Sequence, residues 1–413
     1  MHVIVGNGIA GLTAAQVIRK FGPGIDVTLV SEEKHPAYSP CVFPNYISGE
    51  IGRERIFLNS HEDYLKMGIH PIFGKRVLEV DTDEKKVFLE DGNPLQYDKL
   101  VIATGSEPII PRIDGVEKKG VFTLKTLGDV DEFLAYPKGK IAIVGAGFIG
   151  VETAMALKMR DYDVTLIESL DHVLPAAFDE EPAHLIETAL QKHEIKIFTG
   201  EKVTQIFGGE EVKGIEVGGR EIKCDAVVLA TGMKPRVDLA KRAGMKIGKL
   251  GGILTDERMS TSAKDVYACG DCTESRDLVT GRSTLNLIWP NAVLQGWVAG
   301  HNCVGIPKKY LGFMNIVGID LFGTPVASIG HTLATIGNGG CEVVEKTLGT
   351  YYSRIILKNG AIVGAQFIGR TEKMGVLFGA IWKKARIEDI KKVLSERELL
   401  TMNPWYMGIK PYL

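Results

Sequence analysis

Two stretches of the chain share one pattern of hydrophobic and polar positions. In each, a short apolar run (residues 3–5 and 141–144) precedes a glycine-rich turn, and apolar positions at helical spacing follow the turn. A second apolar run then closes each stretch, at residues 27–30 and 164–167. The order of strand, helix and strand is typical of a βαβ unit, so the pattern predicts two doubly wound parallel sheets.

Further apolar runs extend both sheets. Residues 100–105 and 227–232 match each other, and each reads as a buried strand that ends in a glycine turn. A third run of this kind, residues 266–271, lies outside both units. We expect it to return to the first sheet, which makes the first domain discontinuous in sequence.

The character of the chain changes from about Gly312. Residues 350–358 and 361–368 alternate as strands around Asn359-Gly360, the preferred pair for a type I′ hairpin turn. Residues 372–385 then have helical spacing of apolar side chains. The expected fold class is therefore α/β: two doubly wound, Rossmann-like domains and a small C-terminal α+β domain. The expected domain boundaries are residues 1–112 with 241–311, residues 113–240, and residues 312–413.

Composition removes several classes of function. The 413 residues carry 49 Lys and Arg against 51 Asp and Glu, so the basic excess of a nucleic-acid-binding protein is missing. No uncharged apolar run reaches the roughly 18 to 20 residues that cross a bilayer, and we expect no signal peptide, because the first residues lack a basic region and lead straight into a strand. Six Cys are too few for a disulfide scaffold. A cytoplasmic location is the expectation.

The two glycine turns, residues 6–11 and 145–150, both have the spacing GxGxxG. The first glycine allows a tight turn, the second lets a pyrophosphate approach the backbone, and the third lets helix pack on strand. The helix that follows offers free N–H groups and a partial positive charge to phosphates. Each turn also has an acid about 20 residues later, the context that indicates a dinucleotide site.

The two acids suggest which nucleotides bind. Glu168 is followed by Ser-Leu-Asp with no Arg, so a 2′-phosphate would meet a carboxylate and no guanidinium, which favours NADH over NADPH. In the first unit Glu32 is the expected ribose contact, and Glu33 is the alternative. Asp271 follows the apolar run at 266–271, where a carboxylate can accept hydrogen bonds from a polyol such as the ribityl chain of a flavin, or simply cap the next turn. A helix is predicted from Trp289 onward, and the partial positive charge at its N-terminus would stabilise the negative charge of a reduced flavin.

Taken in order, five motifs resemble the FAD-dependent pyridine nucleotide-disulfide oxidoreductase superfamily. They are GNGIAG at 6–11, LVIATGS at 100–106, GAGFIG at 145–150, VVLATGMKP at 227–235 and YACGD at 267–271. The resemblance implies an FAD domain, an inserted NAD domain and a C-terminal third domain. It also implies that Glu152 lies by the nicotinamide and that Phe148 covers the flavin face when no nucleotide is bound.

The resemblance further implies two sets of cofactor-binding residues. For FAD they are Gly6, Gly8, Ala10, Gly11, Glu32, Val77, Ala103, Thr104, Gly105, Gly270 and Asp271. For the nicotinamide cofactor they are Gly145, Gly147, Phe148, Ile149, Gly150, Glu168 and Gly232. The candidate catalytic residues are Cys41 and Glu152, and no metal site is expected.

The branch of the superfamily depends on Cys41. The two-cysteine branch needs Cys-x4-Cys, and Tyr46 stands at the partner position, so that branch is ruled out. Residues 38–44 are similar to single-cysteine NADH oxidases and coenzyme A-disulfide reductases, and also to rubredoxin reductases and nitrite reductase flavoproteins. Residues 352–360 look like the third domain of the latter pair, and residues 39–58 are similar to flavin subunits of multi-subunit 2-oxoacid oxidoreductases.

Two interpretations of Cys41 stay open. At a helix start beside the flavin its thiol pKa would fall and favour a redox-active thiolate; alternatively, it packs as a small apolar residue. Cys269 and Cys272 form a CxxC, but Gly270 and Asp271 between them are already explained by flavin binding, so core packing is favoured over zinc.

The leading hypothesis is an FAD-dependent oxidoreductase that passes electrons from NADH through FAD to an acceptor, either an iron–sulfur or a rubredoxin-like redox partner protein or subunit docking near the third domain. The alternative is a single-cysteine NADH oxidase, or a coenzyme A-disulfide or polysulfide reductase, that uses Cys41. A non-enzymatic NAD- or FAD-sensing module is a third class. A homodimer is compatible with each of these.

Overall fold

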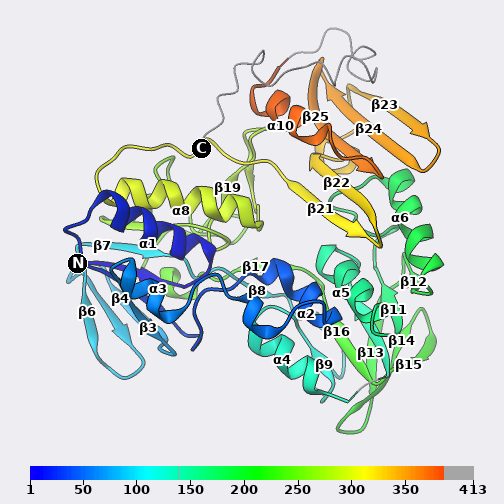
Figure 1. The fold of residues 1–413 in the computed structure, drawn as a ribbon, viewed down its shortest axis with the longest axis horizontal. Helices are drawn as coiled ribbons and strands as arrows, with labels where there is room; N and C mark the ends of the chain where they lie inside the picture. Colours follow the sequence, from blue (N-terminus) through cyan, green and yellow to red (C-terminus); the bar gives the residue numbers. More distant parts are fainter. Residues whose placement is uncertain (138, 386–413) are drawn as a thin grey trace. The chain divides into compact units, whose positions relative to one another are not determined.

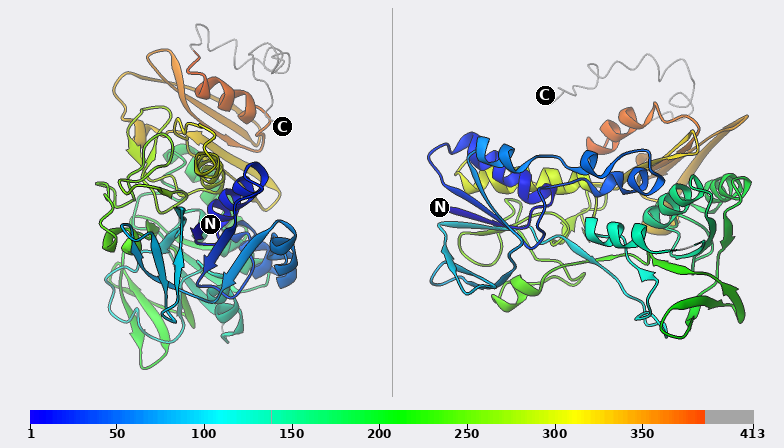
Figure 2. Two further views of the ribbon diagram at one scale, coloured as in Figure 1. Left: turned by 90° about the vertical axis from the view of Figure 1, so that its left-hand side faces the viewer. Right: turned by 60° about the horizontal axis from the view of Figure 1, so that its bottom comes forward.

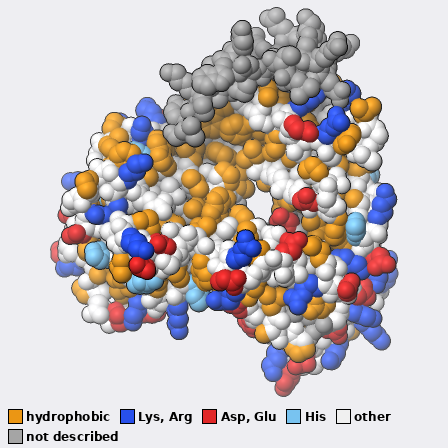
Figure 3. Space-filling view, viewed as in Figure 1, with side chains coloured by type: hydrophobic (Ala, Val, Ile, Leu, Met, Phe, Trp, Pro, Cys, Tyr) orange, Lys and Arg blue, Asp and Glu red, His pale blue; other side chains and the backbone are white. Residues whose placement is uncertain are grey.

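The computed structural model describes residues 1–137 and 139–385, which fold into two compact units (Figure 1). The first unit contains Met1–Ile109, Lys125–Val130 and Gly232–Phe313, and the second contains Ile110–Leu124, Asp131–Thr231 and the described residues from Met314 onward. Among the described helices, none has the length and apolar character that a bilayer crossing requires. On the face drawn in Figure 3, cationic and anionic side chains are interspersed, in keeping with a net charge of -2.

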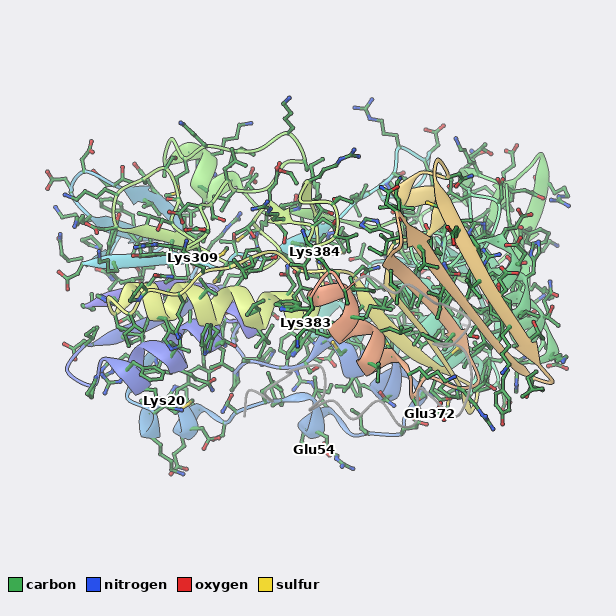
Figure 4. The ribbon with its side chains drawn as sticks, turned by 90° about the horizontal axis from the view of Figure 1, so that it is seen from above. Lys20, Glu54, Lys309, Glu372, Lys383 and Lys384 are labelled. Atoms are coloured by element: carbon green, nitrogen blue, oxygen red, sulfur yellow. The ribbon has the colours of Figure 1, made fainter. Side chains whose placement is uncertain are left out.

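The first unit is built on a five-stranded parallel sheet in the order β18-β7-β1-β2-β3. Its strands are β1 (His2–Val5), β2 (Val27–Ser31), β3 (Ile69–Phe73), β7 (Lys99–Ile102) and β18 (Val266–Ala268). Tyr267 of β18 lies opposite Val101 of β7, which confirms that the third apolar run returns to the first sheet. Helices α1 (Ile9–Phe21) and α8 (Trp289–Cys303) pack side by side in this unit (Figures 1 and 4).

Smaller elements complete the first unit. An antiparallel meander consists of β4 (Val77–Asp81), β5 (Lys86–Leu89) and β6 (Pro94–Gln96). Two short antiparallel pairs join β8 (Ser106–Pro108) to β17 (Met233–Pro235) and β19 (Ser275–Arg276) to β20 (Ser283–Thr284). The short helices are η1 (Pro40–Val42), α2 (Phe43–Ser48), η2 (Arg53–Ile56), α3 (His61–Lys66) and α7 (Asp238–Arg242), and α4 (Leu127–Ala135) begins in this unit.

The second unit repeats the plan of the first. Its five-stranded parallel sheet has the order β12-β11-β10-β16-β9. The strands are β9 (Val121–Phe122), β10 (Lys140–Val144), β11 (Asp163–Ile167), β12 (Lys196–Phe198) and β16 (Ala226–Leu229), with helices α5 (Phe148–Lys158) and α6 (Glu180–Lys192). A second antiparallel meander, β13 (Val203–Gly208), β14 (Val212–Val217) and β15 (Arg220–Lys223), stands out beside this sheet (Figure 2). Two doubly wound sheets are therefore confirmed.

The C-terminal part forms a five-stranded antiparallel sheet in the order β21-β22-β25-β24-β23. Its elements are β21 (Ile316–Leu321), β22 (Thr324–Gly330), α9 (Leu333–Ile336), β23 (Cys341–Leu348), β24 (Tyr351–Lys358), β25 (Ala361–Ile368) and α10 (Met374–Trp382). Asn359 (φ 53°) and Gly360 (φ 74°) both have the positive φ of a type I′ turn, as the Asn-Gly pair predicts. The rest of the expected C-terminal domain, from residue 386, lies outside the described residues.

Asp179, the N-cap of α6, joins this sheet to the rest of the second unit. One carboxylate oxygen accepts the Leu333 N–H at 2.9 Å, and the other accepts Gln366 Nε2 at 2.7 Å and lies 3.1 Å from Arg354 Nη1. Asp179, Arg354 and Gln366 are all buried. A buried carboxylate is stable only with such partners, so these contacts fix the C-terminal sheet on α6.

Candidate cofactor sites

The first glycine turn has one crowded side and one open side. A Cβ built on Gly6 (φ +113°) would lie 2.0 Å from the Ala103 carbonyl oxygen, and a Cβ on Gly11 would lie 2.1 Å from the Gly6 carbonyl oxygen. A Cβ on Gly8 would meet nothing within 4 Å. Gly8 is also the N-cap of α1 and offers no side-chain cap. The turn therefore leaves open backbone and free N–H groups where a pyrophosphate can approach.

The second glycine turn repeats this geometry in the second unit. A Cβ on Gly145 (φ +104°) would lie 2.3 Å from the Ala230 carbonyl oxygen, and one on Gly150 would lie 1.9 Å from that of Gly145. A Cβ on Gly147, the uncapped N-cap of α5, would again meet nothing within 4 Å. Each unit thus has a glycine turn whose open side, at Gly8 or at Gly147, can receive a phosphate group; we call each of these a glycine cradle.

Asp271 lies just after β18 in a small polar cluster of the first unit. Its Oδ2 accepts the Ser106 hydroxyl at 2.8 Å and lies 3.9 Å from Lys125 Nζ. Lys125 Nζ also donates to Ser106 Oγ at 3.0 Å. Both contacts of Asp271 use Oδ2, which leaves Oδ1 for a ligand hydroxyl. The Asp271 side chain is 21% exposed, which leaves it accessible from outside.

Glu32 follows β2 and is paired with Arg236. The guanidinium binds both carboxylate oxygens, with Nη2 to Oε2 at 2.8 Å, and it holds the pKa of Glu32 below its ordinary value. The neighbouring Glu33 accepts the Tyr38 hydroxyl at 2.8 Å, and burial raises the pKa of Glu33. A ribose at this place would share Glu32 with Arg236. The sequence reading missed Arg236, although it directly follows the quoted motif that ends at Pro235.

Glu168 follows β11 and accepts a hydrogen bond from the backbone of the second glycine turn. Its Oε2 accepts the Ala146 N–H at 2.8 Å, while Oε1 accepts the Leu170 N–H at 3.0 Å and the Ser169 hydroxyl at 3.2 Å. The residue is 8% exposed. Its carboxylate therefore holds the turn in shape, and the remaining lone pairs are those a ribose hydroxyl would use.

Phe148 and Glu152, the two residues expected beside the flavin and the nicotinamide, both lie in the first turns of α5. Glu152 is partly buried, and burial alone raises its pKa from 4.5 to about 7. A carboxyl with such a pKa exchanges its proton near neutral pH, as acid and base groups of active sites do. Phe148 is the first residue of the helix and is partly exposed, and Ile149 is 42% exposed.

Cys41 is exposed in the turn η1, immediately before α2. Tyr38, three residues earlier, accepts the Leu127 N–H at 3.1 Å and stacks on Phe43 with ring centroids 5.7 Å apart. This segment is therefore anchored on both sides of Cys41. Among the described residues, no group of three or more His, Cys, Asp or Glu side chains is arranged to hold a metal ion.

The CxxC cysteines lie in the core. Cys269 and Cys272 are both fully buried, and burial raises the pKa of the Cys269 thiol and raises that of Cys272 to about 11. Cys272 Sγ donates to the Cys269 carbonyl at 3.3 Å. These thiols are held protonated, which agrees with packing as their role.

The other expected cofactor residues lie at strand ends or turns. Ala103, Thr104 and Gly105 follow β7, and the Thr104 hydroxyl donates to the Arg236 carbonyl at 2.7 Å. Val77 begins β4, and the Gly232 carbonyl accepts the Ile109 N–H at 3.0 Å. The sequence analysis did not predict that Ser106 and Lys125 contact Asp271: Ser106 ends the motif at 100–106 and Lys125 lies in none of the five motifs, and only the fold brings both side chains to Asp271.

Two Rossmann-type sheets, each with an open glycine cradle and an acid after its second strand, define a class of protein that binds two dinucleotides. Comparison with known families then makes the class specific. The family model described as pyridine nucleotide-disulphide oxidoreductase matches residues 1–296. The chain belongs to this family, and it is an FAD-dependent oxidoreductase, as the sequence motifs predict.

Individual relatives cover most of the chain. It is 36% identical to an NADH oxidase of Methanocaldococcus jannaschii over 94% of this chain and 92% of that protein. It is 31% identical to subunit epsilon of NADH-dependent phenylglyoxylate dehydrogenase from Aromatoleum evansii, over 94% and 93%. The solved NAD-dependent persulfide reductase of A. fulgidus is 31% identical with a TM-score of 0.88, over 93% of this chain and 77% of that one.

Proposed function

We propose that the chain takes electrons from NADH and passes them through FAD to a redox partner protein or subunit of the iron–sulfur or rubredoxin-like kind. The observation that carries this proposal is the pair of open glycine cradles, at Gly8 in one unit and Gly147 in the other. Two cradles of the same build suit two dinucleotides. A cytoplasmic location belongs to the same proposal and is supported by the sparse cysteines.

FAD fits the first unit. The residues that would hold FAD lie in the glycine turn, at the ends of β2 and β7, at the start of β4 and in the turn after β18. The uncapped N-terminus of α1 would receive the pyrophosphate, and the free oxygen of Asp271 would accept a ribityl hydroxyl. Glu32, already paired with Arg236, would share its carboxylate with the adenosine ribose.

NADH fits the second unit. The uncapped N-terminus of α5 at Gly147 would receive its pyrophosphate, and Glu168 would accept ribose hydroxyls while it holds the turn through Ala146. A 2′-phosphate would meet the Glu168 carboxylate with no guanidinium among the next three residues, which supports NADH rather than NADPH.

When bound, FAD exchanges two electrons with NADH and one at a time with the partner, so that each NADH yields NAD⁺, H⁺ and two reduced partner centres. The protein itself orients the two cofactors and binds and releases protons. Glu152, with a pKa of about 7, holds a proton on its carboxyl oxygen below neutral pH and releases it above. Partial burial disfavours the charged carboxylate, which is why the proton stays bound up to neutral pH.

A protein partner as the acceptor is supported by the similarity to subunit epsilon of NADH-dependent phenylglyoxylate dehydrogenase, because that relative is one subunit of a larger enzyme. That match spans 94% of the chain, so it extends into the C-terminal sheet beyond residue 296, where the family model ends. We propose that this C-terminal sheet contributes to partner docking.

The test is anaerobic. Purified protein reconstituted with FAD is mixed with NADH, and the flavin absorbance is followed with and without a one-electron viologen dye. Rapid bleaching by NADH and fast dye turnover, with slow turnover on oxygen alone, is the expected result. No bleaching would overturn the proposal and leave a nucleotide-sensing module instead.

A second candidate function is a single-cysteine oxidase or a coenzyme A-disulfide or polysulfide reductase, and one observation favours it. Cys41 is exposed at a turn directly before α2, and no second cysteine stands at the disulfide position. An anaerobic reductive titration separates the two candidates. One equivalent of hydrogen peroxide is added first, so that a redox-active Cys41 starts as a sulfenic acid, which takes up two electrons when it returns to the thiol and water. Uptake of two electrons per FAD then means that the flavin alone is reduced, whereas four electrons per FAD in the wild type and two in Cys41→Ser would make Cys41 a redox centre.

A further inference from the structure

A chain of buried polar side chains runs beside the first turns of α8 in the first unit. Asn291 Nδ2 donates to the Asn286 carbonyl at 2.8 Å, and Asn291 Oδ1 accepts the Tyr310 hydroxyl at 2.7 Å. The Tyr310 hydroxyl also pairs with Ser275 Oγ. Each of these four residues is at most 8% exposed. We call them the Tyr310 cluster.

One helical turn further along α8, Gln295 makes a second set of buried contacts. Its Oε1 accepts the Gly270 N–H at 2.7 Å and the Thr273 hydroxyl at 2.9 Å. Asn291 and Gln295 are four residues apart, so they lie on one face of the helix. The Tyr310 cluster and Gln295 therefore join the first turns of α8 to residues 270–275, the segment that carries Asp271.

Three elements meet where this segment begins. A Cβ built on Gly270 would lie 2.8 Å from the Ala10 Cβ and 3.9 Å from the Ala292 Cβ. A Cβ on Gly296 would lie 2.3 Å from the Ala10 carbonyl oxygen. The start of α1, the Asp271 segment and the first turn of α8 are thus in direct contact, and no side chain caps α8. The positive end of α8 therefore lies beside the first glycine cradle.

We infer that Tyr310 is a positioning residue for the electron-transfer reaction. Its hydroxyl holds the first turn of α8 against the Asp271 segment, so that the positive end of the helix stabilises the reduced and more negatively charged form of FAD. The inference rests on the proposed function only in requiring that FAD binds the first unit. Apolar residues of similar size would pack α8 equally well, but hydrogen bonds fix its direction.

The experiment measures the reduction potential of bound FAD in Tyr310→Phe. The protein is reduced anaerobically by xanthine and xanthine oxidase in equilibrium with a reference dye, so NADH takes no part. We expect oxidised FAD to bind as in the wild type and reduced FAD to bind about three- to tenfold more weakly, a shift of roughly 15 to 30 mV to more negative potential for two electrons.

Tyr267→Phe is the matched control. Its hydroxyl donates to the Asn302 carbonyl at 3.3 Å, at the opposite end of α8, so the same change there should leave the potential at the wild-type value. An unchanged potential in Tyr310→Phe, or an equal shift in both variants, overturns the positioning role.

If Tyr310→Phe does not fold, Ser275→Ala removes one partner of the same hydroxyl and should give a smaller shift in the same direction; no shift there overturns the inference as well. Failure of the wild type to bind FAD would refute the proposed function instead, so the two failures are distinguishable.

Discussion

Replacing Gly147 by alanine tests whether the open side of the second glycine turn is a ligand site. Gly147 has φ −71° and ψ −175°, which alanine adopts without strain, and its Cβ would meet nothing within 4 Å. The folded protein should therefore tolerate the methyl group. Alanine is a poorer N-cap than glycine, but it also restricts the unfolded chain, so the free energy of unfolding should change by about 1 kcal/mol or less.

The same methyl group would occupy the space in which a pyrophosphate approaches the N–H groups of α5. Losing one charge-assisted hydrogen bond costs about 1.5–3 kcal/mol, so NADH affinity should fall roughly 10- to 150-fold. Gly150→Ala is the contrast, because its Cβ would lie 1.9 Å from the Gly145 carbonyl oxygen. That variant should lose about 1–3 kcal/mol of stability, even without nucleotide.

The assay combines urea denaturation of the nucleotide-free variants with titration of NADH by quenching of protein fluorescence. The expected result is a stable Gly147→Ala that binds NADH weakly and a destabilised Gly150→Ala. If Gly147→Ala binds NADH with wild-type affinity, the open side of the turn is not where the pyrophosphate lies, and the assignment of the site is refuted.

Three further predictions follow from individual residues. Burial raises the pKa of Glu152 from 4.5 to about 7, so the wild type should lose stability as pH rises through that window. Glu152→Gln should therefore be the more stable protein by at most about 3 kcal/mol near pH 8, but not near pH 4. Urea denaturation at both pH values measures this difference, and a difference that does not depend on pH contradicts the prediction. Arg354→Met leaves the buried Asp179 carboxylate without its cation and should cost about 3–5 kcal/mol in the free energy of unfolding. Arg220→Met is the control: Arg220 pairs with Glu201 at the surface, and this variant should behave as the wild type in the same denaturation. Lys125→Met removes the cation of the Asp271 cluster and should weaken FAD retention about fivefold, a loss of roughly 1 kcal/mol; equilibrium dialysis with flavin fluorescence measures it, and unchanged retention argues against a role for that cluster.

Local patterns were sufficient for the sheets and the glycine turns. A strand followed by GxGxxG and a helix has few other solutions, and the two turns have the crowded and open sides that glycine spacing predicts at Gly6, Gly8 and Gly11. The Asn359-Gly360 turn could likewise be predicted from the sequence, because a type I′ turn has two consecutive positive φ angles, which Asn and Gly adopt most readily.

Contacts between side chains that lie far apart in the chain could not be predicted from the sequence. Arg236 reaches Glu32 across 204 residues, and Lys125 reaches Asp271 only because the chain returns to the first unit at residues 125–130. The same holds for the joint between Asp179 and Arg354. Periodicity reports which face of an element is buried, but it carries no information on which charged groups meet.

The acceptor is the central claim, and anaerobic NADH turnover tests it most directly when the wild type and Cys41→Ser are each given a viologen dye and, separately, coenzyme A disulfide. Transfer to a redox partner predicts that both proteins reduce the dye at similar rates and that neither reduces the disulfide. If the wild type reduces the disulfide and Cys41→Ser does not, the electrons leave through Cys41, and the account of a partner-directed flavoprotein is contradicted.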